Sequence, residues 1–403
     1  MEIDFSAPPL VRDALSRIGR TEDIGFSPSG DRIAIAGLLE NRILLLDLDR
    51  QAGEFPEKLP EQLAVSHCVE AHSHHLAHPH GLCWIDDRML VVANRAGGIV
   101  LFEVPPRGHP VSPVGLEPTA VLASAAHAPI HTPGSVSAIG LGGGLVELLV
   151  CNNYANTLSR HLLDGRAGYS ALSSEILLME GLRLPDGVAH SASGRWIAVS
   201  NHEAQAVLLY RNDRHLCPSR APDATLHGIR YPHGLKFTPD EASLLVADAG
   251  APLLHVFDSG DDGWCDRQRP ARSIPIMDDA TYDRGNYNHV EGGPKGIDIS
   301  PDGGLIVLTC TERPLAFFRA GAIDDRFAPA PAALKWPAEE LHRDALLRFA
   351  VAAQDRARAQ EERIRQEARR DFDAIVRSRS WRFTEPLRRI ARSARGLIPS
   401  GDR

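Results

Sequence analysis

The sequence predicts an all-β fold, a six-bladed β-propeller, followed by a long C-terminal α-helical tail. Two observations lead to this prediction. A Pro-x-Gly triplet followed by short apolar strands recurs along the chain, and 34 glycines and 29 prolines in 403 residues favour many strands joined by turns. After Pro337 the composition changes to Arg, Glu and Ala, without Gly or Pro as far as about Val376, which is typical of a helix.

The repeat is clearest in "YPHGLKFTPDEASLLVADAGAPLLHVFD" at 231–258. An apolar strand follows the triplet, a Pro-Asp turn leads to a second strand, and a loop precedes a third strand. Closely similar copies lie at 78–104, 184–210 and 293–318, and weaker copies lie at 21–48 and 132–163. The middle positions of the six triplets form what we call the inner ring: Glu22, His80, Ser135, Asp186, His233 and Lys295.

Successive inner-ring positions are separated by 58, 55, 51, 47 and 62 residues. A period of this length suits blades of about four strands. A single blade cannot bury both of its faces, so neighbouring blades must stack in a ring. Six copies therefore predict six blades, and a β-sandwich with accidental internal similarity is the alternative.

In a six-bladed ring, blades three apart lie on opposite sides of the channel. The first strand of each blade lines that channel, and the residue before the triplet glycine points into its mouth. The expected opposed pairs are Glu22 with Asp186, His80 with His233, and Ser135 with Lys295. Carboxylates, imidazoles and an ammonium converging there suit a metal site, direct acid/base work on a substrate, or a polar plug of water and ion pairs.

The repeat resembles those of the gluconolactonase / senescence marker protein family and of the broader lactonase-like and NHL-type propellers, over about residues 20–335. The resemblance implies that triplet residues hold a divalent metal and that neighbouring polar groups hold a sugar lactone. The sequence has His233 where that family usually has Asn. Because imidazole favours zinc, manganese or iron over calcium, one such metal is the expected cofactor. The expected metal ligands are Glu22, His80, Asp186 and His233.

Catalytic roles are expected for Asp186, His233 and His80. A second set of polar residues ends the second strands of the repeats: Asn94, Asn153, Asn201, Asp248 and Thr311. Substrate-binding roles are expected for Lys295, Asn201, His202, Asp248 and His289, the last from a long polar loop at 277–293 that could cover the mouth. The alternative for the strand-end residues is turn formation through side-chain-to-backbone hydrogen bonds.

Six histidines stand between residues 67 and 80. Only His80 occupies an inner-ring position, so we expect His72, His74 and His75 to lie outside the channel. Replacing His233 should therefore lose the channel metal, whereas replacing His74 should not.

Charge and composition restrict the partners. The net charge of −8 divides into +7 for residues 341–403 and −15 for the rest, which argues against nucleic acid binding by the acidic body. The sequence contains no run of eighteen apolar residues, so no membrane span is expected. The opening residues lack a secretion signal. The six cysteines form no C-x-x-C pair, which suits a reducing cytoplasm. The expected segments are 1–19, an N-terminal segment; 20–336, the propeller; 337–377, the long helix; and 378–403, a basic tail.

The basic tail contains "SRSWRFTEPLRRIARSARGLIP" at 378–399, in which an apolar helix face alternates with arginines behind Trp381. Such a helix suits an anionic membrane surface, with a protein partner as the alternative. The stretch also resembles the SWR-x-T-x-PLR tails of bacterial surface-polysaccharide glycosyltransferases and methyltransferases. The helix at 337–377 has a narrow apolar seam that suits a coiled-coil partner, including a second copy of the chain, or a contact with its own body.

These observations leave several functions open. The first is a cytoplasmic propeller, peripheral to the inner membrane, that acts in O-antigen or capsule assembly and binds a sugar or glycan at the channel mouth. The second is a metal-dependent lactonase or esterase. The third and fourth are a glycosyltransferase-like catalytic role and a non-catalytic scaffold for polysaccharide-assembly enzymes. Whether the protein is an enzyme does not follow from its sequence.

Overall fold

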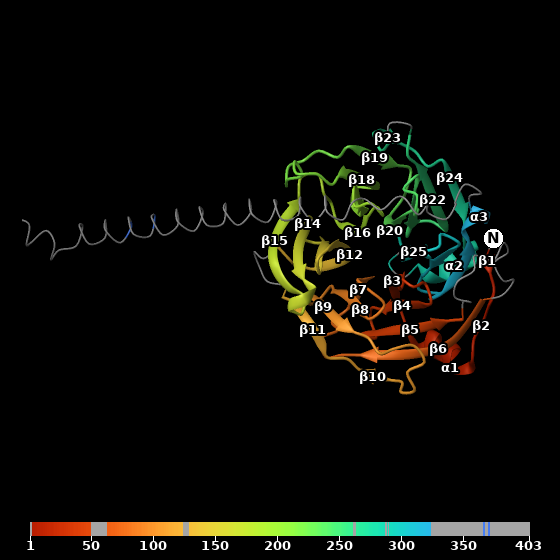
Figure 1. Ribbon diagram of the computed structural model, residues 1–403. Coiled ribbons are helices and arrows are strands. Elements are labelled where there is room, and N and C mark those ends of the chain that lie inside the picture. The colour runs from red at the N-terminus through yellow and green to blue at the C-terminus, as the bar shows by residue number, and fades with distance from the viewer. Residues whose placement is uncertain are drawn as a thin grey trace, which may run out of the picture. The chain divides into compact units, whose positions relative to one another are not determined.

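Six antiparallel sheets are arranged around a common axis, as the computed structural model shows (Figure 1). The structure describes residues 2–49, 63–123, 129–260, 263–286, 288, 290–323, 366 and 370. Each sheet runs from an inner strand at the axis to an outer strand at the rim. The prediction of six blades is confirmed.

The strands of each blade follow one another in the chain, apart from the last. From the axis outward, the first three blades are β3 (Thr21–Phe26), β4 (Arg32–Gly37), β5 (Arg42–Leu48) and β6 (Leu63–His72); β7 (Pro79–Trp84), β8 (Met89–Asn94), β9 (Ile99–Glu103) and β11 (Pro118–Leu122); and β12 (Pro133–Gly142), β13 (Leu145–Asn152), β14 (Thr157–Asp164) and β15 (Ser170–Leu178). The next two are β16 (Pro185–His190), β17 (Trp196–Asn201), β18 (Ala206–Arg211) and β19 (Ala224–His227); and β20 (Pro232–Phe237), β21 (Ser243–Asp248), β22 (Leu253–Asp258) and β24 (Arg272–Pro275). Two short strands add to the rim in parallel pairing: β10 (Val114–Gly115) beside β6 and β23 (Asp266–Gln268) beside β19.

The sixth blade is completed by the start of the chain. Its inner strands are β25 (Ile297–Ile299), β26 (Leu305–Leu308) and β27 (Ala316–Arg319), and its outer strand is β1 (Glu2–Ile3). In the antiparallel pairing of β1 with β27, Glu2 lies opposite Phe318. Segment 1–19, separated from the propeller on sequence grounds, thus supplies the strand that closes the ring.

The segment after β1 covers the outer edge of the first blade. Strand β2 (Phe5–Ser6) pairs in parallel with β6, and helix α1 (Pro9–Arg17) packs against β5 and β6. Val11, Ala14 and Leu15 form the buried face of this helix. The start of the chain therefore covers a strand edge that would otherwise be open to pairing.

Apolar side chains fill every interface between adjacent blades. Strand β4 shows why: Ile33 and Ile35 face the sixth blade, whereas Ala34 and Ala36 face the second blade. Successive side chains of a strand point to opposite faces, so a strand buried on both faces has an almost continuously apolar sequence. Six apolar clusters of this kind, one per interface, hold the ring together.

Helices are few in the described part of the chain. Besides α1 they are η1 (Gly165–Ala167), η2 (His202–Ala204), α2 (Asp279–Gly285) and α3 (Ala320–Ile323). Helix α2 lies in the 277–293 loop, where Asp278 caps it by accepting a hydrogen bond of 2.8 Å from the Thr281 amide. Within the described ranges, no helix has the length and apolar character needed to cross a bilayer.

The chain divides into two units, Met1–Leu346 and Leu347–Arg403. The helix expected at 337–377 and the basic tail expected at 378–403 lie outside the described residues, except for Gln366 and Arg370.

Candidate functional site

The inner-ring side chains are aimed by β-bulges in the inner strands. In β7 the register passes from Pro79 opposite Asn94 to Gly81 opposite Ala93, so His80 has no partner across the ladder. A similar irregularity leaves Glu22 unmatched in β3 and Asp186 in β16, and in β20 it leaves His233 unmatched together with Gly234. A bulge re-aims the extra residue, and here it brings these four side chains together.

The third blade corrects one inner-ring assignment. Its register passes from Pro133 opposite Asn152 to Ser135 opposite Cys151, so the bulged residue is Gly134 and not Ser135. A Cβ atom on Gly134 would lie 1.7 Å from Oδ1 of Asn153, so a side chain cannot fit there. The Asn153 side chain occupies that space instead, and its amide nitrogen donates to Oδ1 of Asp186.

Glu22, His80, Asp186 and His233, which we call the channel quartet, place their polar atoms close together. Oε2 of Glu22 lies 3.6 Å from Nε2 of His80 and 3.5 Å from Nε2 of His233. The Asp186 carboxylate completes the group, with Oδ1 3.9 Å from Nε2 of His80 and Oδ2 3.2 Å from Nε2 of His233. All four side chains are at least 95% buried. The two imidazoles stack with ring centroids 5.5 Å apart. They come from the second and fifth blades, which lie on opposite sides of the channel.

The hydrogen bonding of His80 fixes which nitrogen faces the quartet. Its Nδ1 lies 2.7 Å from the carbonyl oxygen of Gly134 and therefore donates its proton there. Burial, with a smaller effect of Arg95, lowers the pKa of His80 to about 3. The ring is thus neutral near pH 7, and its Nε2 lone pair points at the carboxylates of Glu22 and Asp186. A lone pair facing carboxylate oxygens is unfavourable unless a cation or another proton lies between them.

Basic side chains surround both quartet carboxylates. Nζ of Lys295 lies 3.2 and 3.0 Å from the two Glu22 oxygens, and Arg20 pairs with the same carboxylate. Arg95 donates to Oδ1 of Asp186 at 3.1 Å. Burial alone would raise the pKa of both acids. For Glu22, Lys295, a hydrogen bond from His233 and Arg20 oppose burial and its pKa is lowered; for Asp186, His233, Arg95 and His202 oppose burial and its pKa is lowered. Both acids therefore remain ionised at neutral pH.

His202 and Glu291 extend the site beyond the quartet. Nε2 of His202 lies 3.2 Å from Oε1 of Glu291, and its Nδ1 lies 3.8 Å from Oδ2 of Asp186. The other Glu291 oxygen lies 3.1 Å from Nζ of Lys295. Burial lowers the pKa of His202, but the bond to Glu291 and the charge of Asp186 outweigh this effect and raise it. The 277–293 loop thus contributes Glu291, while His289 lies outside the described residues.

Asn201 and Asp248, expected to bind substrate, instead hold the turn before each triplet. The Asn201 amide accepts a hydrogen bond from the Arg183 backbone N–H and donates to Gly181. Asp248 accepts from the Arg230 and Tyr231 amides, each at 2.8 Å. Equivalent bonds join Asn94 to Ala77 and Asn152 to His131. Because these polar atoms are already bonded to backbone, the structure supports the turn-forming alternative for both residues.

In three blades, the residue directly after the strand-end residue reaches Asp186 of the quartet. Arg95 follows Asn94, Asn153 follows Asn152, and His202 follows Asn201. The sequence analysis selected His202 but not Arg95. It placed Asn153 at the end of the strand, a position that Asn152 occupies in the structure. The repeat register could have identified all three. Arg20, two residues before Glu22, was also missed, and nothing in the repeat distinguishes it.

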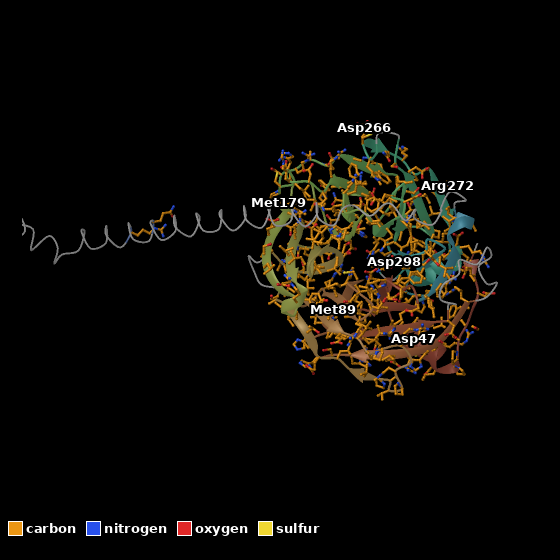
Figure 2. All side chains as sticks on the ribbon, in the orientation of Figure 1. Asp47, Met89, Met179, Asp266, Arg272 and Asp298 are labelled. Atoms are coloured by element: carbon orange, nitrogen blue, oxygen red, sulfur yellow. The ribbon has the colours of Figure 1, made fainter. Side chains whose placement is uncertain are left out.

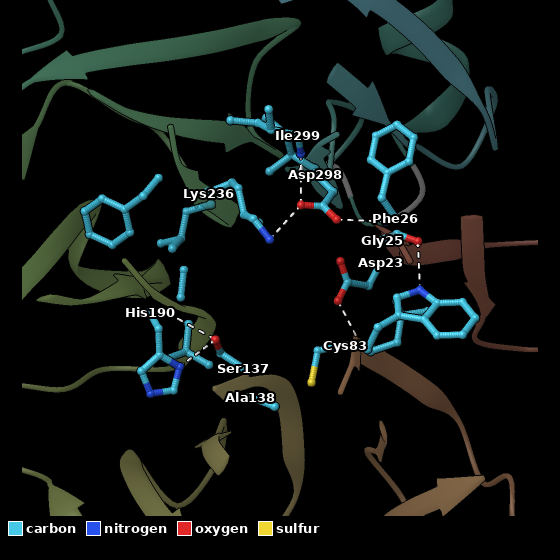
Figure 3. A pocket seen from close by; sticks show the side chains of 18 of the residues that line it. Asp23, Gly25, Phe26, Cys83, Ser137, Ala138, His190, Lys236, Asp298 and Ile299 are labelled. Atoms are coloured by element: carbon cyan, nitrogen blue, oxygen red, sulfur yellow. Dashed lines mark hydrogen bonds and ion pairs between the residues drawn. The ribbon is translucent and has the colours of Figure 1, made fainter. Parts of the chain in front are cut away.

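A separate cavity of about 400 Å³ is lined by residues further along the inner strands (Figure 3). Nζ of Lys236 lies 2.7 Å from Oδ1 of Asp298, and the other Asp298 oxygen accepts from the Phe26 amide in the next blade. Asp23 accepts in the same way from Leu82, and burial raises the pKa of Asp23 to about 7. In Figure 2, Asp298 lies near the axis, whereas Asp266 lies at the rim. Asp23 and Asp298 thus tie neighbouring blades together, which gives them a structural role.

No protein-family model matches the chain, and no curated protein matches its sequence significantly. Among solved structures, a candidate 6-phosphogluconolactonase from Bacteroides uniformis is similar with a TM-score of 0.48 and 15% identity, covering 73% of this chain and 80% of its own. Regucalcin, a calcium-binding protein from Agrobacterium tumefaciens, is similar with a TM-score of 0.48 and 13% identity, covering 78% and 94%. Hydrazine synthase from Kuenenia stuttgartiensis has a TM-score of 0.45 and 13% identity, covering 74% and 83%.

Proposed function

We propose that this propeller holds one divalent transition metal in the channel quartet and hydrolyses a small lactone or ester there. The observation that carries the proposal is a buried ring of ligand groups: one ligand atom from each of Glu22, His80 and His233 lies within 4.8 Å of the others, and Asp186 faces the two histidines with one carboxylate oxygen each. The Nε2 lone pair of His80 is directed into this ring because Nδ1 is bonded to Gly134. Oδ1 of Asn153, also buried, has no hydrogen-bond partner among the described residues and is a further available acceptor.

The spacing of the quartet suits a small metal ion. Ligands about 2.0–2.2 Å from a tetrahedral metal lie about 3.4 Å from one another. Oε2 of Glu22 lies 3.6 Å from Nε2 of His80 and 3.5 Å from Nε2 of His233, close to that value, and Oδ2 of Asp186 lies 3.2 Å from Nε2 of His233. Calcium prefers six to eight oxygen ligands at longer distances, so this donor set favours zinc, manganese or iron.

The surrounding residues would position the substrate and balance charge. A metal in the quartet would polarise a substrate carbonyl and lower the pKa of a water molecule. Arg95 is suited to orient the substrate, because its side chain is 22% exposed and already donates to Asp186. Lys295 and Arg20 pair with Glu22 and compensate its charge.

A sugar-binding channel without a metal is the second candidate. It is favoured by the pairing of Lys295 with both oxygens of Glu22, because this ion pair already compensates the carboxylate. The channel would then be a polar funnel that binds hydroxyl groups. The two candidates differ in metal content and in turnover.

Hydrolysis is tested with chelator-stripped full-length protein, reloaded with zinc or manganese and assayed on aldonolactones and p-nitrophenyl acetate. Turnover should require the metal and should fall by more than about 100-fold in His233→Ala, since even supporting residues of metal sites are worth 10- to 100-fold. His131→Ala, an exposed histidine outside the quartet, should keep wild-type turnover. A fully loaded protein that hydrolyses none of these compounds would leave the sugar-binding candidate, which calorimetry with aldoses would then test.

We propose bacterial surface-polysaccharide assembly as the biological setting. This rests on the SWR-x-T-x-PLR resemblance at 380–388, which lies outside the described residues. The substrate would then be a sugar-derived lactone or an ester on a glycan. The protein would act in the cytoplasm at the inner membrane surface, and self-association through 337–377 is a further part of this proposal.

Deletion of 378–403 should abolish binding to anionic vesicles and leave the propeller folded. Each basic residue near such a surface contributes about 1 kcal/mol, so binding of the full chain should weaken steeply with salt. Co-sedimentation with phosphatidylglycerol vesicles measures this, and neutral phosphatidylcholine vesicles are the control. Equal binding with and without the tail would remove the membrane role and favour a protein partner.

A further inference from the structure

Two adjacent histidines lie in a fixed turn outside the channel. The turn connects β6 to β7 and is closed by a hydrogen bond of 3.1 Å from the Leu76 amide to the Ser73 carbonyl, with His74 and His75 at its central positions. The Ser73 hydroxyl also accepts from the His75 amide at 3.2 Å. The two imidazole rings lie together, with centroids 4.2 Å apart.

A carboxylate from a separate segment reaches the same place. Glu117 follows the short strand β10, whose parallel pairing with β6 sets Gly115 opposite His72. The Leu116 amide continues this pairing with a 2.7 Å hydrogen bond to the His72 carbonyl. The pairing brings Glu117 to the turn, so one ligand atom from each of His74, His75 and Glu117 lies within 4.8 Å of the others.

Both segments are anchored in the same apolar cluster. Leu76 directly follows the two histidines and Leu116 directly precedes Glu117, and both leucines are buried between the first and second blades. Further along the turn, the Ala77 amide donates to Asn94 at 3.0 Å. The backbone that carries the three ligands is therefore already ordered, and a metal would not have to pay for ordering it.

We infer that His74, His75 and Glu117, which we call the outer triad, form a second divalent-metal site, separate from the channel quartet. Two imidazoles and one carboxylate are a donor set that binds zinc, cobalt, nickel or copper, with water in the remaining positions. His74 and Glu117 are exposed, so an ion can reach the triad directly from solvent.

A metal at the outer triad would tie the β6–β7 turn to the segment after β10. That turn leads into β7, which begins at Pro79 and carries His80. Occupancy would thus restrain the chain five residues before a quartet ligand. The inference does not depend on the proposed hydrolase function, because the two sites share no residue.

The test is calorimetric titration of chelator-stripped full-length protein with zinc chloride. Wild-type protein should bind two equivalents, and the double variant His74→Ala/His75→Ala should bind one. Glu117→Gln should weaken the outer site by about tenfold or more. His72→Ala, from the same histidine run but outside the triad, is the matched control and should bind two. Circular dichroism checks that each variant is folded.

The pattern of losses separates the two sites. If wild-type protein binds one equivalent of zinc and the double variant binds none, the outer triad is supported as a metal site and the proposed channel metal is contradicted. If the double variant binds as much zinc as wild-type protein, with unchanged affinity, the outer triad is overturned. Cys217 and Cys265 are exposed and could also bind zinc, so cobalt spectra without thiolate charge-transfer absorption should accompany the equivalent assigned to the triad.

Discussion

Replacing His233 with Ala is expected to abolish metal binding in the channel. His233 contributes an imidazole whose Nε2 lies within 3.5 Å of both quartet carboxylates. Without it, the remaining ligands are one imidazole and two acids that Lys295, Arg20 and Arg95 already compensate. We expect affinity to fall by more than about 100-fold, a larger effect than loss of a supporting residue. Metal analysis after dialysis, with zinc titration, measures it.

Two histidine variants are the controls for this experiment. His131 is exposed and outside both metal clusters, so His131→Ala should keep both equivalents. His74→Ala should keep the channel equivalent, whatever happens at the outer triad. If His233→Ala retains the channel metal with unchanged affinity, His233 is not one of its ligands and the proposed ligand set is wrong. If zinc and manganese bind there in neither protein, the quartet is an ion-pair network and the hydrolase proposal falls.

Replacing Asp248 with Ala is expected to destabilise the propeller by about 3 kcal/mol. The carboxylate accepts from the amides of Arg230, Tyr231 and Gly250 and from Nε2 of His255, and it is 1% exposed. Truncation leaves these buried donors without an acceptor, at about 1–3 kcal/mol for each one that water cannot reach. Asp248→Asn should cost less than Asp248→Ala, since one acceptor oxygen remains. Urea denaturation measures both.

The effect of Asp248 should depend on pH. Burial raises its pKa, but the hydrogen bonds from His255 and the backbone outweigh burial and lower the pKa below the ordinary value. The carboxylate therefore stabilises the folded state above the unfolded-state pKa of about 3.9 and loses this effect as the pH falls through the folded value. The stability difference between wild-type protein and Asp248→Asn should shrink from pH 6 to pH 3.

Glu203→Ala, at an exposed carboxylate, is the control and should leave stability within about 0.5 kcal/mol of wild type. If Asp248→Ala is as stable as wild-type protein but loses a sugar or lactone ligand, then the substrate-binding role expected from the sequence is correct and the structural role is wrong.

The sequence by itself determined the fold and the position of most of the site. The triplet repeat predicted six blades, because local features decide it: apolar alternation marks strands, and Pro-Asp and Gly mark turns. It also placed Glu22, His80, Asp186 and His233 at one level, because equivalent positions of a repeat occupy equivalent places in a ring. Their convergence follows from that symmetry and from the bulge that each of the four inner strands has at this position.

Only the tertiary structure decided the features that break the repeat. Strand β1 closes the sixth blade through pairing over more than three hundred residues, and no local pattern in two residues predicts such a partner. The third repeat is too weak to be aligned to within one residue from its sequence. The strand register was needed to place the bulge at Gly134 and to show that the Asn153 side chain fills the space beside it. Arg20 and Glu291 reach the quartet from loops whose paths depend on long-range packing. The outer triad likewise depends on the parallel pairing of β10 with β6, which brings Glu117 to His74 and His75 across more than forty residues.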